Sequence, residues 1–199
     1  FTLSTGCAPA TRTVTVYPTP DPIGGASSVC ASGATTTLTN TFPGGTWTSA
    51  APAVASIAVG TGIVTGHIAG TAGISYTSAN GCVVTTTLTV NPLPAAIAGA
   101  SSVCVGNTIT LTDPTSGGTW ASSNTAQATV GVGTGVVTGV TAGSPTIIYT
   151  LAATGCSAST SVIVNPVPAP NSGGSAVCLV GTTTHTDRSE VHPSDSNHT

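Results

Sequence analysis

Residues 118–150 read GTWASSNTAQATVGVGTGVVTGVTAGSPTIIYT, a run of short β-branched and aromatic segments interrupted by glycine. Residues 135–140 and 145–150 each have the length and composition of one strand and lie between turn residues. Upstream, residues 107–112 alternate polar and apolar side chains, which is typical of a strand with one face on a core. Six or seven such strands fit within 74 residues. We therefore predict an all-β fold made of compact antiparallel sandwiches.

The same pattern recurs along the chain, which indicates tandem domains. GASSVC ends at Cys30 and again at Cys104, and GGSAVC ends at Cys178, so these cysteines are 74 residues apart. Proline-containing linkers recur at the same spacing. Because a proline restricts its own backbone conformation and that of the residue before it, we expect short, stiff connections. They divide the chain into the end of a preceding repeat (1–17), two whole repeats (18–91 and 92–165) and the start of a third (166–199) with a divergent tail (185–199).

The partial repeats at the two ends have two explanations. The chain is either a window of a longer array, or a subunit whose trailing part completes the leading part of the next chain by strand donation. The partial repeats contain 17 and 34 residues, which together fall short of one repeat.

Charge is scarce, and this excludes several classes of protein. The chain has two basic and five acidic residues, and 39% of its residues are hydrophobic. A nucleic-acid partner needs a basic surface, and disorder needs low hydrophobicity with high charge. Polar or small residues interrupt every apolar run, so we also expect no membrane span.

Residues that could serve in catalysis or bind a metal are also few. An active site needs positioned acids, bases or nucleophiles, and few titratable residues are available. The cysteines form no CxxC motif, and the carboxylates are too few for calcium. We predict that the protein is not an enzyme, has no metal site and needs no cofactor.

The quoted run, with GCSAS at 155–159 and VNPVP at 164–168, resembles a known family. It is similar to the group 2 bacterial immunoglobulin-like domains, and its flanks resemble tandem Ig-like repeats of large secreted surface proteins in Bacteroidetes-type bacteria. The resemblance covers about residues 1–184. It implies tandem Ig-like sandwiches in a secreted, extracellular or cell-surface protein.

Four aromatic residues recur at equivalent positions in the two whole repeats. They could stack on sugars at a binding face, but a small sandwich usually needs one large side chain in its core. We predict a core position for Trp47, Trp120, Tyr76 and Tyr149.

Six cysteines at repeating positions indicate an oxidising compartment and structural disulfides. The repeat allows pairing within each repeat (Cys30 with Cys82), between consecutive cysteines (Cys82 with Cys104) or across a junction (Cys30 with Cys156). An Ig-like strand order implies that Cys30 and Cys82 lie at opposite ends of a sandwich, which favours the junction pairing, and the within-repeat pairing stays open. The predicted disulfide cysteines are Cys7, Cys30, Cys82, Cys104, Cys156 and Cys178.

A surface with so little charge must be covered or used in packing, because near-neutral β modules tend to associate. Clustered threonines are candidates for O-glycosylation: Thr35, Thr36, Thr37, Thr85, Thr86 and Thr87. We predict a structural module of an extracellular bacterial fibre or stalk, whose partners are copies of itself, neighbouring repeats and covalent glycans. The alternative is an adhesin module that binds a glycan or a surface protein.

Overall fold

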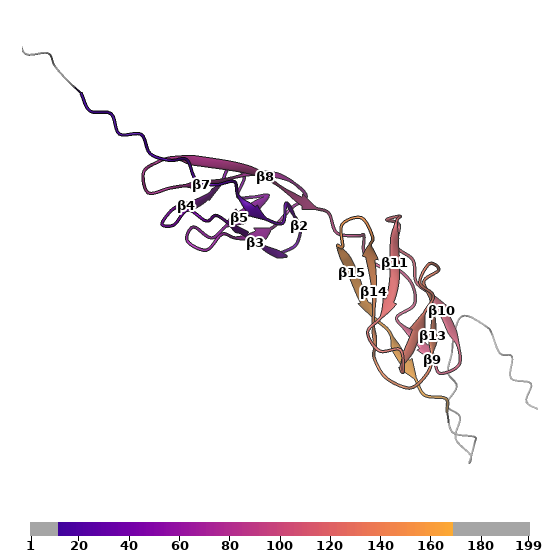
Figure 1. The fold of residues 1–199 in the computed structure, drawn as a ribbon. Coiled ribbons are helices and arrows are strands. Elements are labelled where there is room, and N and C mark those ends of the chain that lie inside the picture. Colours follow the sequence, from indigo (N-terminus) through magenta and orange to yellow (C-terminus); the bar gives the residue numbers. More distant parts are fainter. Residues whose placement is uncertain (1–11, 169–199) are drawn as a thin grey trace, which may run out of the picture. The chain divides into compact units, whose positions relative to one another are not determined.

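The computed structural model describes residues 12–168, and every regular element in that range is a β-strand (Figure 1). The chain divides into two compact units. Of the described residues, the first unit contains 12–96, 113–119 and 149–158, and the second contains 97–112, 120–148 and 159–168. The all-β prediction is confirmed.

The first whole repeat forms two four-stranded sheets. One sheet has the order β1-β3-β6-β5 and the other has the order β2-β8-β7-β4. The strands are β1 (Gly24–Gly25), β2 (Ser28–Cys30), β3 (Thr35–Thr39), β4 (Thr46–Ser49), β5 (Ala55–Ile57), β6 (Ile63–Gly66), β7 (Gly70–Thr77) and β8 (Val83–Asn91).

Alternation of side chains explains why these segments are strands with one buried face. In β7, Ala72, Ile74 and Tyr76 are buried, whereas Gly73 between them is exposed. In β8, Leu88 and Val90 are buried, whereas Thr87 and Thr89 are exposed. Because side chains alternate between the faces of a strand, this period places the apolar residues of both sheets in one core.

One pairing differs from the predicted antiparallel arrangement. The first strand of the sheet, β2, runs parallel to the last, β8, with Val29 opposite Val90 and Cys30 opposite Asn91. The hydrophobic pattern cannot predict this direction, because a short strand buries the same residues whether it is parallel or antiparallel. The other pairs of the first repeat are antiparallel.

The second whole repeat is built in the same way. Its strands are β9 (Ser102–Cys104), β10 (Thr108–Thr110), β11 (Gly118–Ser122), β12 (Ala128–Val130), β13 (Val136–Gly139), β14 (Thr146–Leu151), β15 (Ser157–Ser161) and β16 (Ile163–Asn165). The strand orders are β10-β13-β12, β11-β14-β15 and β16-β9. The pair β9·β16 is parallel, as β2·β8 is in the first repeat.

An aromatic pair fills the core of the first repeat. Trp47 lies opposite Tyr76 across β4 and β7, and the ring centroids are 4.8 Å apart. The Tyr76 hydroxyl accepts a hydrogen bond from the Gly45 N–H at 2.9 Å and donates one to the Phe42 carbonyl. A Cβ at Gly45 would lie 2.4 Å from Tyr76 Cζ, so this loop position requires glycine.

The second repeat repeats this arrangement. Tyr149 accepts a hydrogen bond from the Gly118 N–H at 2.9 Å and donates one to the Thr115 carbonyl at 2.6 Å. Trp120 and Tyr149 are 7% and 6% exposed, and Trp47 and Tyr76 are 5% and 4% exposed. All four aromatic side chains are therefore buried, and each tyrosine also anchors a loop through its hydroxyl group.

The loop before each tryptophan-bearing strand begins with a different side chain in the two repeats. In the first repeat, Asn40 accepts a hydrogen bond from the Phe42 N–H and donates its amide to the Asp21 carbonyl at 2.5 Å. Asp113 occupies the equivalent position in the second repeat. Its Oδ1 accepts from the Thr115 N–H at 2.7 Å, but its buried Oδ2 has no hydrogen-bond partner. A carboxylate cannot supply the donor that the asparagine amide supplies.

We predict that Asp113→Asn stabilises the second repeat by about 1 kcal/mol, because the new amide can donate to the Ala95 carbonyl as Asn40 donates to Asp21. Urea unfolding of the full chain measures this change. The reciprocal variant Asn40→Asp is the matched control and should lower the free energy of unfolding by a similar amount. A loss of stability in Asp113→Asn would contradict the argument.

Candidate functional site

The described residues offer little chemistry for catalysis. Within residues 12–168, no group of three or more His, Cys, Asp or Glu side chains could hold a metal ion. Ser56 Oγ lies 2.8 Å from His67 Nε2, at an exposed position. The two carboxylates in this range already accept hydrogen bonds, Asp21 from the Thr41 hydroxyl and Asp113 from the Thr115 N–H. The Ser56–His67 pair therefore has no acid beside it of the kind that orients a catalytic histidine.

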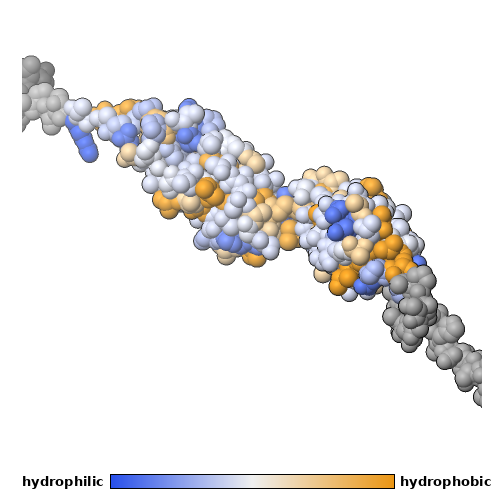
Figure 2. Space-filling view, turned by 90° about the horizontal axis from the view of Figure 1, so that it is seen from below, coloured by the Kyte–Doolittle hydropathy of each residue, from blue (hydrophilic) through white to orange (hydrophobic). Residues whose placement is uncertain are grey.

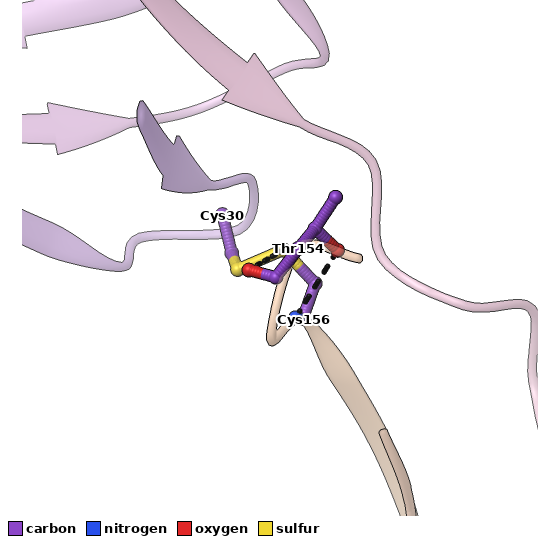
Figure 3. Close-up of a disulfide and its surroundings, with 3 residues drawn as sticks. All are labelled: Cys30, Thr154 and Cys156. Carbon is purple, nitrogen blue, oxygen red and sulfur yellow. Dashed lines mark hydrogen bonds between the residues drawn. A yellow bond between two sulfur atoms is a disulfide. The ribbon is translucent and has the colours of Figure 1, made fainter. Parts of the chain in front are cut away.

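The principal feature of the structure is a disulfide between Cys30 and Cys156 (Figure 3). The Cα atoms of the two cysteines are 5.6 Å apart, within the usual range for a disulfide. Cys30 ends β2, and Cys156 follows β14 in the turn that leads to β15. The bond joins the two sequence repeats across a separation of 126 residues, and both cysteines belong to the first compact unit.

Local structure holds Cys30 at the end of its strand. Directly after it, the Ala31 N–H donates to the Asn91 carbonyl at 2.9 Å, which continues the parallel pairing of β2 with β8. The chain then turns, with Ser32 at a φ of 68° and with the Gly33 N–H donating to the Gly66 carbonyl at 2.8 Å. The turn therefore fixes where the Cys30 side chain is presented.

Cys156 is held in an equally defined turn. The Leu151 N–H donates to the Cys156 carbonyl at 2.9 Å, and the Gly155 N–H donates to the Leu151 carbonyl at 2.8 Å. Gly155 has a φ of 73°, which favours glycine over any residue with a side chain. Cys156 is 1% exposed, so the disulfide is shielded from solvent on this side.

Strand register explains why Cys30 does not pair with Cys82. Cys30 lies opposite Asn91, at the far end of β8, whereas Cys82 directly precedes the first residue of that strand. Nine residues of extended chain span roughly 30 Å. Disulfide-bonded Cα atoms lie within about 7 Å of each other, so the within-repeat pair cannot form in this fold.

The other cysteines differ from one another. Cys104 is also disulfide-bonded. Cys82 is a free thiol in this structure, so its predicted disulfide is not formed within the described residues and stays a prediction. Cys82 occupies in the first repeat the position that Cys156 occupies in the second. Cys156 of the second repeat binds Cys30 of the first repeat. Cys7, Cys178 and the tail 185–199 lie outside the described residues.

A pocket of about 370 Å³ lies at one end of the first repeat, beside Phe42, Trp47 and Tyr76. The Asn40 amide and the Tyr76 hydroxyl on its wall already form hydrogen bonds within the repeat. Thr115 stands at the position of Phe42 in the second repeat, and its hydroxyl accepts from the Ala95 N–H at 2.9 Å. The second repeat therefore keeps the tryptophan and the tyrosine but lacks the phenylalanine of this wall.

The exposure of the threonines in each cluster alternates along its strand. Thr35 and Thr37 on β3 and Thr85 and Thr87 on β8 are exposed, whereas Thr36 and Thr86 are half-buried. Large apolar side chains also reach the surface, and Figure 2 shows hydrophobic patches between hydrophilic and neutral residues. Those on the strands and turns of the two repeats include Val59, Ile63, Ile68, Val83, Val132, Val136, Val140 and Ile163.

No protein-family model matches the chain, and no curated protein matches it. Solved structures do match it. Domains 4 and 5 of the S-layer protein SbsC are 22% identical over 76% of this chain and 100% of that chain, with a TM-score of 0.36. A C-terminal 282-residue fragment of intimin, solved in complex with the intimin-binding domain of the translocated intimin receptor, is 16% identical over 74% of this chain and 64% of the fragment, with a TM-score of 0.43.

Drosophila N-cadherin EC1-4 is 10% identical over 70% of this chain and 48% of that chain, with a TM-score of 0.32. At these TM-scores the superpositions carry no argument about function. The sandwich fold follows from the strand pairing and the shared core described above. The described residues contain no helix that could cross a membrane.

Proposed function

We propose that this chain is a structural module of an extracellular bacterial surface fibre or stalk, built from tandem Ig-like sandwiches that are stapled by disulfides. The observation that supports this most strongly is the Cys30–Cys156 bond, which closes a loop of 126 residues across two repeats. A single-domain disulfide would stabilise one sandwich, whereas this bond joins consecutive repeats covalently.

The bond changes how tension passes along the chain. When the two ends are pulled, force enters at Cys30 and leaves at Cys156 without loading the backbone between them. That backbone contains most of both sandwiches, including the paired cores around Trp47 and Trp120. The small core of each sandwich stabilises it only modestly. A module with this disulfide resists extension even when its non-covalent interactions are weak.

The same features support an extracellular location and a non-enzymatic role. Disulfides persist in oxidising compartments outside the cytosol. The resemblance to group 2 bacterial Ig-like domains, and to the secreted repeats of Bacteroidetes-type bacteria, points the same way. In the described residues, the scarce titratable side chains serve turns and loops, as Asp21 and Asp113 do.

O-glycans or lateral packing would cover the uncharged surface. The exposed hydroxyls of Thr35 and Thr37 lie on one sheet of the first repeat, and those of Thr85 and Thr87 lie on the other. Glycans at these positions would hydrate both faces of the sandwich, and copies of the chain or neighbouring repeats would cover the apolar patches. Adhesion remains the second candidate, since the pocket beside Phe42 could receive a ligand group.

Single-molecule force spectroscopy tests the mechanical role. We predict that the oxidised full chain, held at its two ends, has a shorter contour length than the fully reduced chain by 126 residues. At 3.3–3.6 Å per extended residue this difference is roughly 420–450 Å. Cys82→Ser is the matched control and should behave as the unmodified chain does, because Cys82 is free. Equal contour lengths before and after reduction would contradict the proposal.

Mass-spectrometric site mapping of the protein from its native source tests the glycan prediction. We expect glycans on the exposed hydroxyls of Thr35, Thr37, Thr85 and Thr87, and we expect Thr36 and Thr86 to be unmodified because their side chains are half-buried. Unmodified hydroxyls at all six positions would remove glycosylation from the proposal and leave lateral packing as the cover of the surface.

A further inference from the structure

The segment at residues 13–17 has the alternating sequence of a strand but lies outside every strand of the structure. Its sequence, Thr-Val-Thr-Val-Tyr, stands at the repeat position of 87–91 in β8 and of 161–165, which run from the last residue of β15 to the end of β16. Leu88 and Val90 are 0% and 1% exposed, whereas the equivalent Val14 and Val16 are 76% and 88% exposed. Within the described residues, this segment pairs with no strand.

The two whole repeats show which strand its equivalents bind. In the first repeat, the Thr89 N–H donates to the Ser27 carbonyl and the Ala31 N–H donates to the Asn91 carbonyl, both at 2.9 Å. In the second repeat, Ile163 donates to Ser101 and Val105 donates to Asn165, again at 2.9 Å. Both repeats thus hold a Ser-Val-Cys strand in parallel register through the same pair of backbone hydrogen bonds.

The corresponding backbone groups of the unpaired segment are the Thr15 N–H and the Tyr17 carbonyl. A first strand in the same register would accept from Thr15 and donate to Tyr17. Its valine would lie opposite Val16, as Val29 lies opposite Val90. The residue that donates to Tyr17 would directly follow the cysteine of that strand, as Ala31 follows Cys30.

A free thiol lies at this same place. Cys82 Sγ is 4.0 Å from the Tyr17 carbonyl oxygen. The repeat equivalent of Cys82 is Cys156, and the repeat equivalent of Tyr17 is Asn91. At those equivalent positions, Cys30 binds Cys156 while the residue after Cys30 donates to Asn91. A first strand bound along 13–17 would therefore bring its cysteine to Cys82.

We propose that residues 13–17 and Cys82 form one docking site for the Ser-Val-Cys first strand of another repeat of the same type. Backbone hydrogen bonds from Thr15 and to Tyr17 give the register, burial of Val14 and Val16 gives apolar contact, and Cys82 forms the covalent bond. The arrangement is a form of strand pairing between an extended segment and an incoming strand. It repeats the Cys30–Cys156 bond at the neighbouring junction of the array.

The covalent step is a thiol–disulfide exchange. The partner cysteine arrives as a mixed disulfide with a small thiol. The Cys82 thiolate attacks the partner's sulfur, a new disulfide forms between the two cysteines, and the small thiol leaves with the electron pair and takes up the proton that Cys82 released. The oxidising equivalent therefore comes from the mixed disulfide.

The inference rests on the proposed function, since it names the partner in the array, but its test is separate. The contour-length experiment depends on Cys30 and Cys156 and does not involve Cys82. If the peptide does not react preferentially at Cys82, the contour-length difference is unaffected. If the contour lengths are equal, the reaction at Cys82 can still be measured.

The test uses the oxidised full chain and a peptide of sequence GASSVCAS, which is that of residues 25–32, activated at its cysteine as a mixed disulfide with thionitrobenzoate. Release of the coloured thiol gives the rate, and peptide mapping locates the cross-link. We expect the reaction at Cys82 to be at least about tenfold faster than with the control peptide GASSDCAS, because docking raises the local concentration of the disulfide. Equal rates for the two peptides would overturn the proposal.

Thr15→Pro removes the N–H that the register requires, at an exposed position outside every strand. This variant should lose the rate advantage of GASSVCAS while keeping the same reactivity of Cys82 toward a small aromatic disulfide. Val59→Asp, at another exposed valine, is the control and should keep the advantage. An undiminished advantage in Thr15→Pro, or a cross-link that maps to a cysteine other than Cys82, would contradict the docking site.

Discussion

The parallel pairing of the first strand with the last strand of each sandwich determines where the cysteines can react. In the first repeat this pairing puts Cys30 opposite Asn91, at the end of the domain where the linker begins. It also separates Cys30 from Cys82 by the length of β8. The bond to Cys156 is the consequence, and it converts two short sandwiches into one covalent unit. The mechanical role that we propose depends on this geometry and not on any ligand.

The composition of the chain suits such a design. Side chains that are small, β-branched and uncharged build the sheets, and the buried core of the first repeat contains one tryptophan, one tyrosine and eight aliphatic residues. A core of this size stabilises a domain weakly, and a disulfide that closes a long loop adds stability chiefly by restricting the unfolded chain. Glycine is required where loops approach the core tyrosines closely, as at Gly45 and Gly118, because a Cβ there would overlap the ring.

The sequence predicts part of this structure for physical reasons that can be stated. Alternation within β7 and β8 shows in the residue pattern because each strand has one buried and one exposed face. The direction of β2 does not show, because the three residues Ser-Val-Cys would bury valine in either direction. The sequence does not predict the unpaired Oδ2 of Asp113, since Asp-Pro is typical of an ordinary turn. The missing donor is apparent only when the hydrogen bonds of Asp113 are compared with those of Asn40. The free state of Cys82 does not show in the sequence either, because the repeat pattern treats all six cysteines alike.

Disulfide mapping of the unreduced protein tests the central claim most directly. Trypsin has few sites because the chain contains two basic residues, so cleavage by pepsin at acidic pH is preferable, and low pH also suppresses thiol–disulfide exchange. We expect a cross-linked pair of peptides that contain Cys30 and Cys156. A pair that joins Cys30 to Cys82 would contradict the strand register, the shielding of the intervening backbone and the mechanical role together.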